Sequence, residues 1–322
     1  MNAKYLSRRL INAILLLVGI SFFSFALLQL APGDFFDEMR MNPRISAATV
    51  EGLRGQYGLD RPLLVRYERW LGSIFRGDLG FSLAYNSPVG PLLQARARNT
   101  LFLTATATAI AWALAIPIGI WGAANRGKWS SRISGLATST LLTVPDLLLF
   151  LCLLLLAVRT GWFPTGGMVS PGLENADLWH RGKDLAIHLF LPSFGLALVT
   201  LPTLVRHIRS AMIEALNSPF VRAARGHGIP RRRLLFRYAL PVATNPLTSL
   251  FGFSVATMLS ASLLVEVILS WPGLGPLLLE ATLTKDIFVV VGIVMLSAVF
   301  LIAGNLLADV LLFASDPRIR VE

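Results

Sequence analysis

The stretch SPFVRAARGHGIPRRRLLFRYALP, residues 218–241, is the most polar segment between the last four hydrophobic runs of this chain. Ser218 followed by Pro219 is a helix-start signal, because serine suits the N-cap and proline suits the first helical position. Gly226-His227-Gly228 is typical of a helix end, and Ile229-Pro230 can begin a second helix. The stretch therefore predicts a short helix, a tight bend and a second, basic helix that runs to Leu240-Pro241.

The composition around this stretch is that of a membrane protein. Of 322 residues, 54% are hydrophobic and 15% are charged, whereas about a quarter of the residues in a soluble domain are charged. The single cysteine, Cys152, lies in an apolar run, which excludes a disulfide framework and a thiolate metal site. The four histidines show no metal-ligand spacing. The sequence therefore predicts no metal, no cofactor and no soluble catalytic domain.

Six runs are long and apolar enough to cross a bilayer, which takes about 20 residues. They are Leu10–Ala31, Asn99–Asn125, Ile133–Val158, Leu185–Val205, Tyr238–Val265 and Ile287–Ala308. None alternates with a period of two, which argues against a β-barrel. The first run is longer than the ~7–15-residue apolar core of a signal peptide, so we expect it to remain as a helix. We predict an all-α polytopic membrane protein with six transmembrane helices.

The distribution of charge predicts the orientation of these spans. With the N-terminus inside, the inner segments carry a net charge of +13 and the outer segments +1. Basic residues collect in cytoplasmic loops, so we expect both termini to be cytoplasmic and residues 206–246 to include a cytoplasmic loop. The formal net charge of +11 then requires no nucleic-acid partner.

The chain is expected to form two regions. Residues 1–98 would hold the first transmembrane helix and an extracytoplasmic cap, in which Ala47–Tyr57 and Leu63–Phe75 are compatible with helices. Residues 99–322 would form a five-helix core. After the fifth run a Pro-Gly pair ends the helix, and Leu277–Leu279 is a short apolar continuation.

Three acidic residues lie in or beside the apolar runs, namely Asp146, Glu266 and Asp309. Ionisable residues in a membrane are costly and usually have a function. Ion coupling would need such acids to face one another near the membrane centre, and only Asp146, directly after Pro145, is expected there. Roles in helix packing or in lining a gate are therefore favoured over ion coupling.

The spacing within residues 218–241 resembles the EAA loop of ATP-binding-cassette importer permeases. That loop has Glu-Ala-Ala, three residues, Gly, nine residues, Ile, one residue and Leu-Pro. Here Arg222-Ala223-Ala224, Gly228, Tyr238 and Leu240-Pro241 keep the spacing, with Arg222 and Tyr238 as the two departures. An arginine in this place resembles the dipeptide, oligopeptide and nickel branch. The segments YGLDRPL (57–63), SWPGLG (270–275) and DPRIR (316–320) resemble the same branch, so the likeness covers nearly the whole chain.

The resemblance implies a type I importer permease of the bacterial inner membrane. It implies that the short helix couples to an ATP-binding subunit, which places in the coupling site Pro219, Phe220, Arg222, Ala223, Ala224, Arg225, Gly228, Leu240 and Pro241. It also implies a second, similar permease, two ATP-binding subunits or domains that hydrolyse ATP in place of this chain, and an extracytoplasmic substrate-binding protein.

The same resemblance favours dipeptides or oligopeptides as cargo and leaves nickel and oligosaccharides open. A secondary transporter driven by an ion gradient would need a midplane cluster of ionisable residues or an inverted repeat, and neither is visible in the sequence. A membrane anchor for an enzyme complex would need neither the proline-containing spans nor the outer cap.

Overall fold

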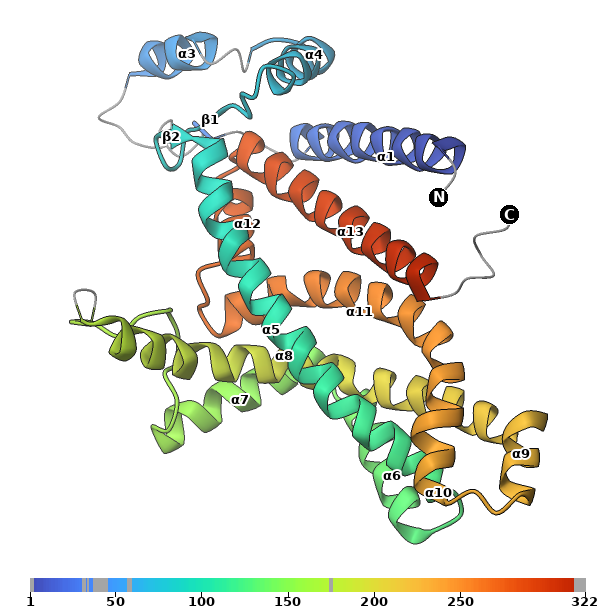
Figure 1. The fold of residues 1–322 in the computed structure, drawn as a ribbon. Helices are drawn as coiled ribbons and strands as arrows, with labels where there is room; N and C mark the ends of the chain where they lie inside the picture. The colour runs from blue at the N-terminus through green and yellow to red at the C-terminus, as the bar shows by residue number, and fades with distance from the viewer. Residues whose placement is uncertain are drawn as a thin grey trace. The chain divides into compact units, whose positions relative to one another are not determined.

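A computed structural model describes residues 3–30, 33, 35–36, 46–56, 60–173 and 176–315. These residues are almost entirely helical, as predicted (Figure 1). The helices are α1 (Ala3–Leu30), α3 (Ala47–Gln56), α4 (Leu63–Ile74), α5 (Val89–Ala124), α6 (Trp129–Thr143), α7 (Asp146–Thr160), α8 (Leu178–Asn217), α9 (Pro219–Gly226), α10 (Arg231–Arg233), the π-helix η1 (Leu234–Ala239), α11 (Leu240–Ile268), α12 (Leu274–Leu283) and α13 (Ile287–Ser315). The strands β1 (Phe81–Ser82) and β2 (Ser87–Pro88) form one antiparallel pair.

Five of these helices, α1, α5, α8, α11 and α13, are long and apolar enough to cross a membrane. The predicted third span, Ile133–Val158, is not one continuous helix, because α6 and α7 meet at a bend of 99°. Val144 and Pro145 have extended backbone there, with ψ of 121° and 137°, since a residue before proline avoids the helical region. Each arm has 15 residues and is about 22 Å long, which is shorter than the ~30 Å hydrocarbon core.

The chain folds into two compact units. The first, called the core unit, is built from residues within Asn99–Pro272 and Phe300–Glu322. The second unit is built from residues within Asn2–Arg98 and Gly273–Val299. One boundary between the units falls inside α5 and another inside α13, so each of these helices belongs partly to both units.

The core unit is organised around α8, which packs along α11 and α6 (Figure 1). α8 continues beyond both ends of the predicted span Leu185–Val205 and contains Pro192 and Pro202 without a break. Its buried side chains join those of α5, α7 and α11 in one hydrophobic cluster, whose fully buried members include Leu103, Phe150, Leu196, Ile208 and Met258. Because this burial holds the helix on several sides, two missing backbone hydrogen bonds do not divide it.

Glycines bring α11 and α13 close together within the core unit. A β-carbon built at Gly252 of α11 would lie 2.1 Å from the β-carbon of Ala308, and one at Gly304 of α13 would lie 3.2 Å from Val255. Small residues allow such close approach between transmembrane helices. The contact holds the part of α13 that belongs to the core unit against α11.

Trp271 closes the end of α11. Its side chain is fully buried, and its indole N–H donates to the Asn99 carbonyl (3.1 Å). The Asn99 side-chain amide in turn donates to the Pro272 carbonyl (2.7 Å). This pair of hydrogen bonds attaches the turn after the fifth span to α5 and confirms the helix end predicted at the Pro-Gly pair.

In the second unit, α4 buries Tyr67 and Trp70 against Phe25 of α1 and Val291 of α13. The Tyr67 and Ser21 hydroxyls are hydrogen bonded (2.9 Å). α3 and α4 correspond to the two helices predicted before residue 76. The segments 57–59 and 316–320, which entered the family resemblance, lie outside the described residues.

The β1–β2 hairpin is joined to α12 and the start of α13. The Ser82 hydroxyl (2.7 Å) and the Ala84 N–H (3.1 Å) both donate to the buried carboxylate of Asp286. The Tyr85 hydroxyl donates to Glu280 of α12. Burial, followed by this hydrogen bond, raises the pKa of Tyr85 to about 12, so the phenol keeps its proton and keeps donating even in alkaline solution, where an ordinary tyrosine ionises. α12 is the short apolar continuation predicted after the fifth span.

Candidate coupling helix

The predicted short helix is present as α9. α8 ends at Asn217, extended backbone at Ser218 (ψ 147°) turns the chain, and Pro219 takes the first helical position. Ser218 occupies the N-cap position, but its hydroxyl donates back to the Ala215 carbonyl of α8 (2.6 Å) and makes no cap bond to α9. The start of α9 therefore depends on proline, whose fixed φ suits the first turn and whose missing N–H needs no partner there.

The predicted glycine stop is a complete C-terminal cap. Gly228 has a φ of +75°, its N–H donates to the Arg225 carbonyl (3.0 Å), and the Ile229 N–H donates to the Ala224 carbonyl (3.3 Å). These two bonds define a Schellman motif, which satisfies carbonyls at the helix end. A β-carbon at Gly228 would meet no atom within 4 Å. Glycine is required here because the backbone is left-handed. It is not required to let another segment of this chain approach closely.

The inner face of α9 anchors it to the core unit. Val221 is 0% exposed and Ala224 is 7% exposed. Both pack against the buried Leu234 of η1, and this cluster is completed by Leu216, Ile229 and Tyr238. Of the two alanines in the EAA-like motif, Ala224 thus belongs to the anchor.

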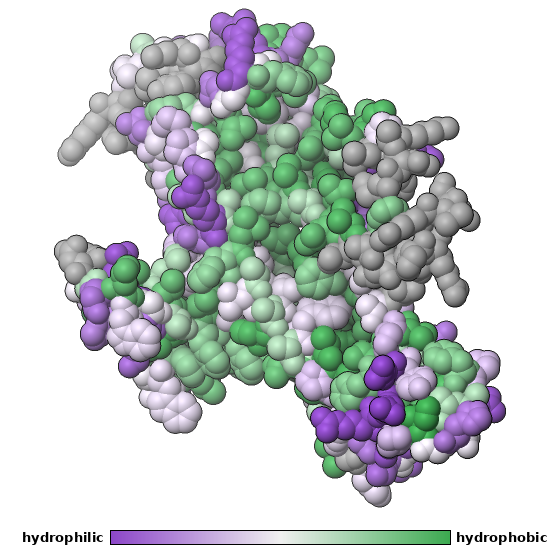
Figure 2. Space-filling model, viewed as in Figure 1, coloured by the Kyte–Doolittle hydropathy of each residue, from purple (hydrophilic) through white to green (hydrophobic). Residues whose placement is uncertain are grey.

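The outer face of α9 is exposed. Phe220 (47% exposed), Arg222, Ala223 and Arg225 all lie on it. Figure 2 shows hydrophilic residues gathered at the end of the core unit where α9 and α10 lie. An exposed aromatic ring beside an accessible small residue and two arginines can form a compact contact surface for another protein.

Leu240 and Pro241 do not join the α9 surface. The predicted second basic helix does not end at Leu240-Pro241, because α10, η1 and α11 follow one another without a break into the fifth span. The Leu240 N–H bonds to the Leu235 carbonyl, five residues back. This wide turn directly precedes Pro241, whose ring would otherwise collide with the carbonyl four residues back. Leu240 packs against the main hydrophobic cluster and Pro241 is exposed.

A cavity of about 450 Å³ lies beside α9. Arg225, Ile229 and Leu234 line it, together with residues at the ends of α5 and α8. α9 is therefore held by one apolar face and by its two chain connections, with open space next to it.

The three candidate acids occupy different environments. Asp146 is exposed as the first residue of α7, after the bend, where a carboxylate interacts favourably with the helix dipole. Glu266 is completely buried near the end of α11, and Asp309 is half-buried in α13. Within the described part of the chain, no group of three His, Cys, Asp or Glu residues could hold a metal ion.

In the sequence analysis, three arginines counted only as positive charges on the inner side of the membrane. In the structure they line the same cleft. Arg126, after α5, and Arg206 and Arg209, on α8, line one cleft in the core unit. Arg206 and Arg209 are three residues apart, and residues with this spacing are neighbours on a helix surface. This spacing could have indicated from the sequence that the two arginines lie close together.

Two family models match this chain. The model described as "Binding-protein-dependent transport system inner membrane component" matches residues 115–321. A second model, "Binding-prot-dependent transport system membrane comp, N-term", matches residues 2–96. Together they span almost the whole chain, including α9 and the segments on both sides of it.

Curated relatives match it along their full length. The chain is 36% identical to the oligopeptide transport system permease protein AppB of Bacillus subtilis (strain 168), with 99% of each chain covered. It is 34% identical to the oligopeptide transport system permease protein OppB of Mycobacterium bovis over 99% of each chain. It is 32% identical to the dipeptide transport system permease protein DppB of Escherichia coli (strain K12) over 98% of each chain. The resemblance found in residues 218–241 is thereby confirmed, and this chain belongs to the family of binding-protein-dependent transport system inner membrane components.

Proposed function

We propose that this chain imports dipeptides or oligopeptides as one permease subunit of an ATP-driven transporter, with α9 as its contact with an ATP-binding subunit. The family and the apolar helices make it a multi-pass inner-membrane permease. The peptide cargo is supported by the relatives named as oligopeptide and dipeptide permeases. One such chain supplies half of the substrate pathway.

The geometry of α9 carries the coupling proposal. A helix of eight residues is about 12 Å long and is bounded by Pro219 and by the Schellman cap at Gly228. Its outer face is available while its inner face is anchored. Ser218 alone separates it from α8, and residues 227–230, α10 and η1 join it to α11, while α8 and α11 pack along each other. A push on α9 is therefore transmitted to two spans at once.

The remaining partners follow from the same assignment. We propose a second, similar permease, two ATP-binding subunits or domains and an extracytoplasmic substrate-binding protein. ATP hydrolysis is assigned to the ATP-binding subunits, so this chain is proposed to have no enzymatic activity of its own. Residues 1–98 are proposed to hold the first span and an extracytoplasmic cap, and residues 99–322 the core with the cytoplasmic loop 206–246.

Packing or gating roles are proposed for the three acids. The backbone N–H of Trp271 donates to the backbone carbonyl of Glu266 (2.9 Å). Glu266 therefore lies beside the turn that closes α11. Asp309 is the next residue after Ala308, which is in close contact with Gly252. Movements of α11 against α13 would displace both acids.

The coupling proposal is tested by replacing Ala223 with tryptophan. Ala223 is exposed on the outer face of α9, so the change should leave the fold intact and obstruct a partner. We expect copurification of the ATP-binding subunit to fall by about tenfold, which corresponds to ~1.4 kcal/mol, while membrane insertion is unchanged. Lys128→Trp is the matched control, because Lys128 is an exposed residue of another basic loop, the one between α5 and α6. Equal copurification of the Ala223→Trp and Lys128→Trp proteins would refute the role of α9.

The cargo is tested separately in vesicles that contain the assembled transporter. ATP-dependent uptake of a labelled dipeptide should be inhibited by unlabelled dipeptides and oligopeptides and be unaffected by nickel ions or oligosaccharides. Competition by nickel or by oligosaccharide alone would overturn the peptide assignment and leave the coupling role of α9 standing.

A further inference from the structure

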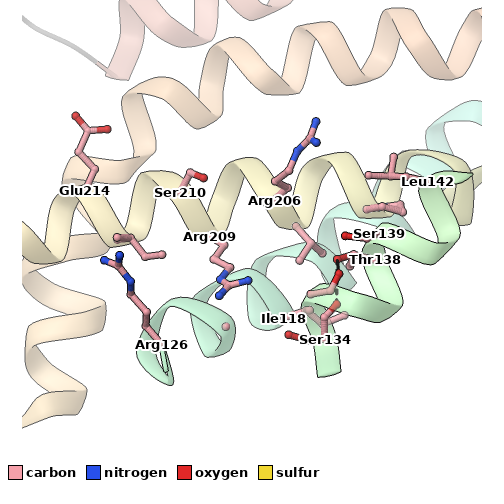
Figure 3. Close-up of a pocket in the computed structure, with 15 residues that line it drawn as sticks. Ile118, Arg126, Ser134, Thr138, Ser139, Leu142, Arg206, Arg209, Ser210 and Glu214 are labelled. Carbon is pink, nitrogen blue, oxygen red and sulfur yellow. Dashed lines mark hydrogen bonds between the residues drawn. The ribbon is translucent and has the colours of Figure 1, made fainter. Parts of the chain in front are cut away.

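A cleft of about 550 Å³ lies between the ends of α5, α6 and α8 in the core unit. It is shown in Figure 3. Arginines and hydroxyl-bearing residues account for much of its lining, whereas a hydrophobic packing defect would be lined by apolar side chains alone. No residue of α9 lines this cleft.

Two glycines make room for the guanidinium group of Arg209. A β-carbon at Gly122 of α5 would lie 3.3 Å from Cδ of Arg209, and one at Gly135 of α6 would lie 3.4 Å from its Nη1. The side chain thus lies between the two glycine surfaces. Its Nε is buried and has no hydrogen-bond acceptor among the residues that the structure describes. A buried donor without an acceptor is costly, so the site favours an added acceptor.

The interior of the cleft is positively charged. In Figure 3, Arg209 points from α8 toward α5 and α6, and Arg126 extends from the end of α5 toward α8. The Arg206 and Glu214 side chains extend away from Arg209 in this view, although both residues also line the cleft. Glu214 is the one acid in the lining, and no ion pair joins it to these arginines in the described chain. Two guanidinium groups therefore face the cleft without a neutralising carboxylate.

Residues beside the cleft are typical of the boundary between membrane and water. Arg126 follows the apolar helix α5 after Asn125, and the exposed Trp121 and Trp129 lie on either side of it in the sequence. Tryptophan is enriched at the boundary between membrane and water. Ile133 and Leu136 on α6 are also exposed, which gives this helix an apolar surface suited to acyl chains.

We propose that the cleft binds the phosphate group of an anionic phospholipid, with Arg209 and Arg126 as hydrogen-bond donors. Guanidinium groups bind phosphate through short, charge-assisted hydrogen bonds, and basic pockets between transmembrane helices on the cytoplasmic side accept anionic headgroups. The acyl chains would lie along Ile133 and Leu136. The bound lipid would hold the end of α8 that leads into α9 against α5 and α6.

Lipid retention by the purified full-length chain, in nanodiscs that contain phosphatidylglycerol and phosphatidylcholine, tests this assignment. Native mass spectrometry should detect phosphatidylglycerol retained on the wild-type chain. Arg209→Gln should weaken retention by about tenfold or more, because it removes a charged donor of hydrogen bonds to the phosphate. Arg132→Gln is the matched control: Arg132 lies in the same loop region, stacks on Trp129 (5.5 Å) and does not line the cleft. It should retain the lipid as the wild type does.

A second variant keeps the test informative if Arg209→Gln fails to fold. Gly135→Val leaves every charge in place and fills the space beside the Arg209 guanidinium, so it should also weaken retention. Equal retention by the wild type and by whichever cleft variants fold would overturn the proposal. Inorganic phosphate added without lipid distinguishes the other source of phosphate. If it protects the wild type against thermal unfolding in pure phosphatidylcholine and phosphatidylglycerol does not, the lipid assignment is wrong.

Discussion

Gly228 is the residue whose backbone holds α9 in place. Its φ of +75° costs a non-glycine residue about 1–2 kcal/mol, while the space around its α-carbon is open. We expect Gly228→Ala to loosen the Schellman cap and to lower ATP-dependent uptake several-fold, with normal membrane insertion. Larger residues should have a stronger effect.

Gly226→Ala is the control for this prediction. Gly226 lies within α9, and a β-carbon there would also meet no atom within 4 Å. Alanine favours the helix by about 1 kcal/mol over glycine, so uptake should be unchanged. Reconstituted vesicles provide the measurement, and equal uptake by the Gly228→Ala and Gly226→Ala transporters would contradict the importance of the left-handed cap.

Gly252 tests packing rather than backbone conformation. Its β-carbon position lies 2.1 Å from the Ala308 β-carbon, so Gly252→Ala forces α11 and α13 apart at an expected cost of about 1–3 kcal/mol. We expect a lower unfolding temperature in detergent. Ala308→Gly, added to the first change, should restore part of the loss.

The control for this packing prediction is Gly182→Ala in α8, where a β-carbon would meet nothing within 4 Å. Its unfolding temperature should equal or exceed that of the wild type. If the Gly252→Ala protein were as stable as the Gly182→Ala protein, the close approach of the two helices would be disproved.

Among the elements, we expect the π-helix η1 to set the angular position of α9 relative to α11. One wide turn displaces the preceding residues by up to the ~100° that separates neighbours on an α-helix. Pro241→Ala restores an N–H at position 241 and permits a regular α-helical bond there. We expect α9 to be rotated relative to α11, so that more ATP is hydrolysed for each peptide transported.

Pro246→Ala is the matched change, because Pro246 is exposed inside α11 without an adjacent π-helix. Its ratio of ATP hydrolysed to peptide transported should stay close to that of the wild type. An unchanged ratio in the Pro241→Ala transporter would show that η1 does not position α9.

The bend between α6 and α7 shows why hydropathy alone does not describe an element. The run 133–158 is long enough to cross a bilayer as a straight helix, yet the structure divides it at Pro145 with a 99° turn. Pro192 and Pro202 leave α8 continuous. The same residue type breaks one helix and not another, because burial on several sides supports α8 where backbone bonds are missing.

For the whole molecule, the predicted orientation of the helices in the membrane can be tested by labelling. In a Cys152→Ala background, Lys128→Cys should be cytoplasmic and Thr165→Cys extracytoplasmic, since basic residues collect on the inner side. Both positions are exposed. An impermeant thiol reagent added to intact cells should label Thr165→Cys alone and should label both after permeabilisation. Labelling of Lys128→Cys in intact cells would reverse the proposed topology.

The local features of this chain were predictable from the sequence. The start and stop of α9 follow from a proline and a left-handed glycine, whose conformational preferences act within one turn of helix. The apolar runs and the EAA-like spacing likewise depend on residues that are close together in the chain, and they led to the membrane fold and the family.

Other features depend on segments that are distant in the sequence, so they form only when the helices pack together. The Trp271–Asn99 hydrogen bonds and the burial of Ala224 arise from packing partners. The cleft around Arg209 is the clearest case. Charge counting placed this arginine on the inner side, but only the approach of Gly122 and Gly135 from two other helices puts its side chain between two glycines. Sequence spacing sets local backbone conformation, whereas burial and the grouping of charges require the helices to meet.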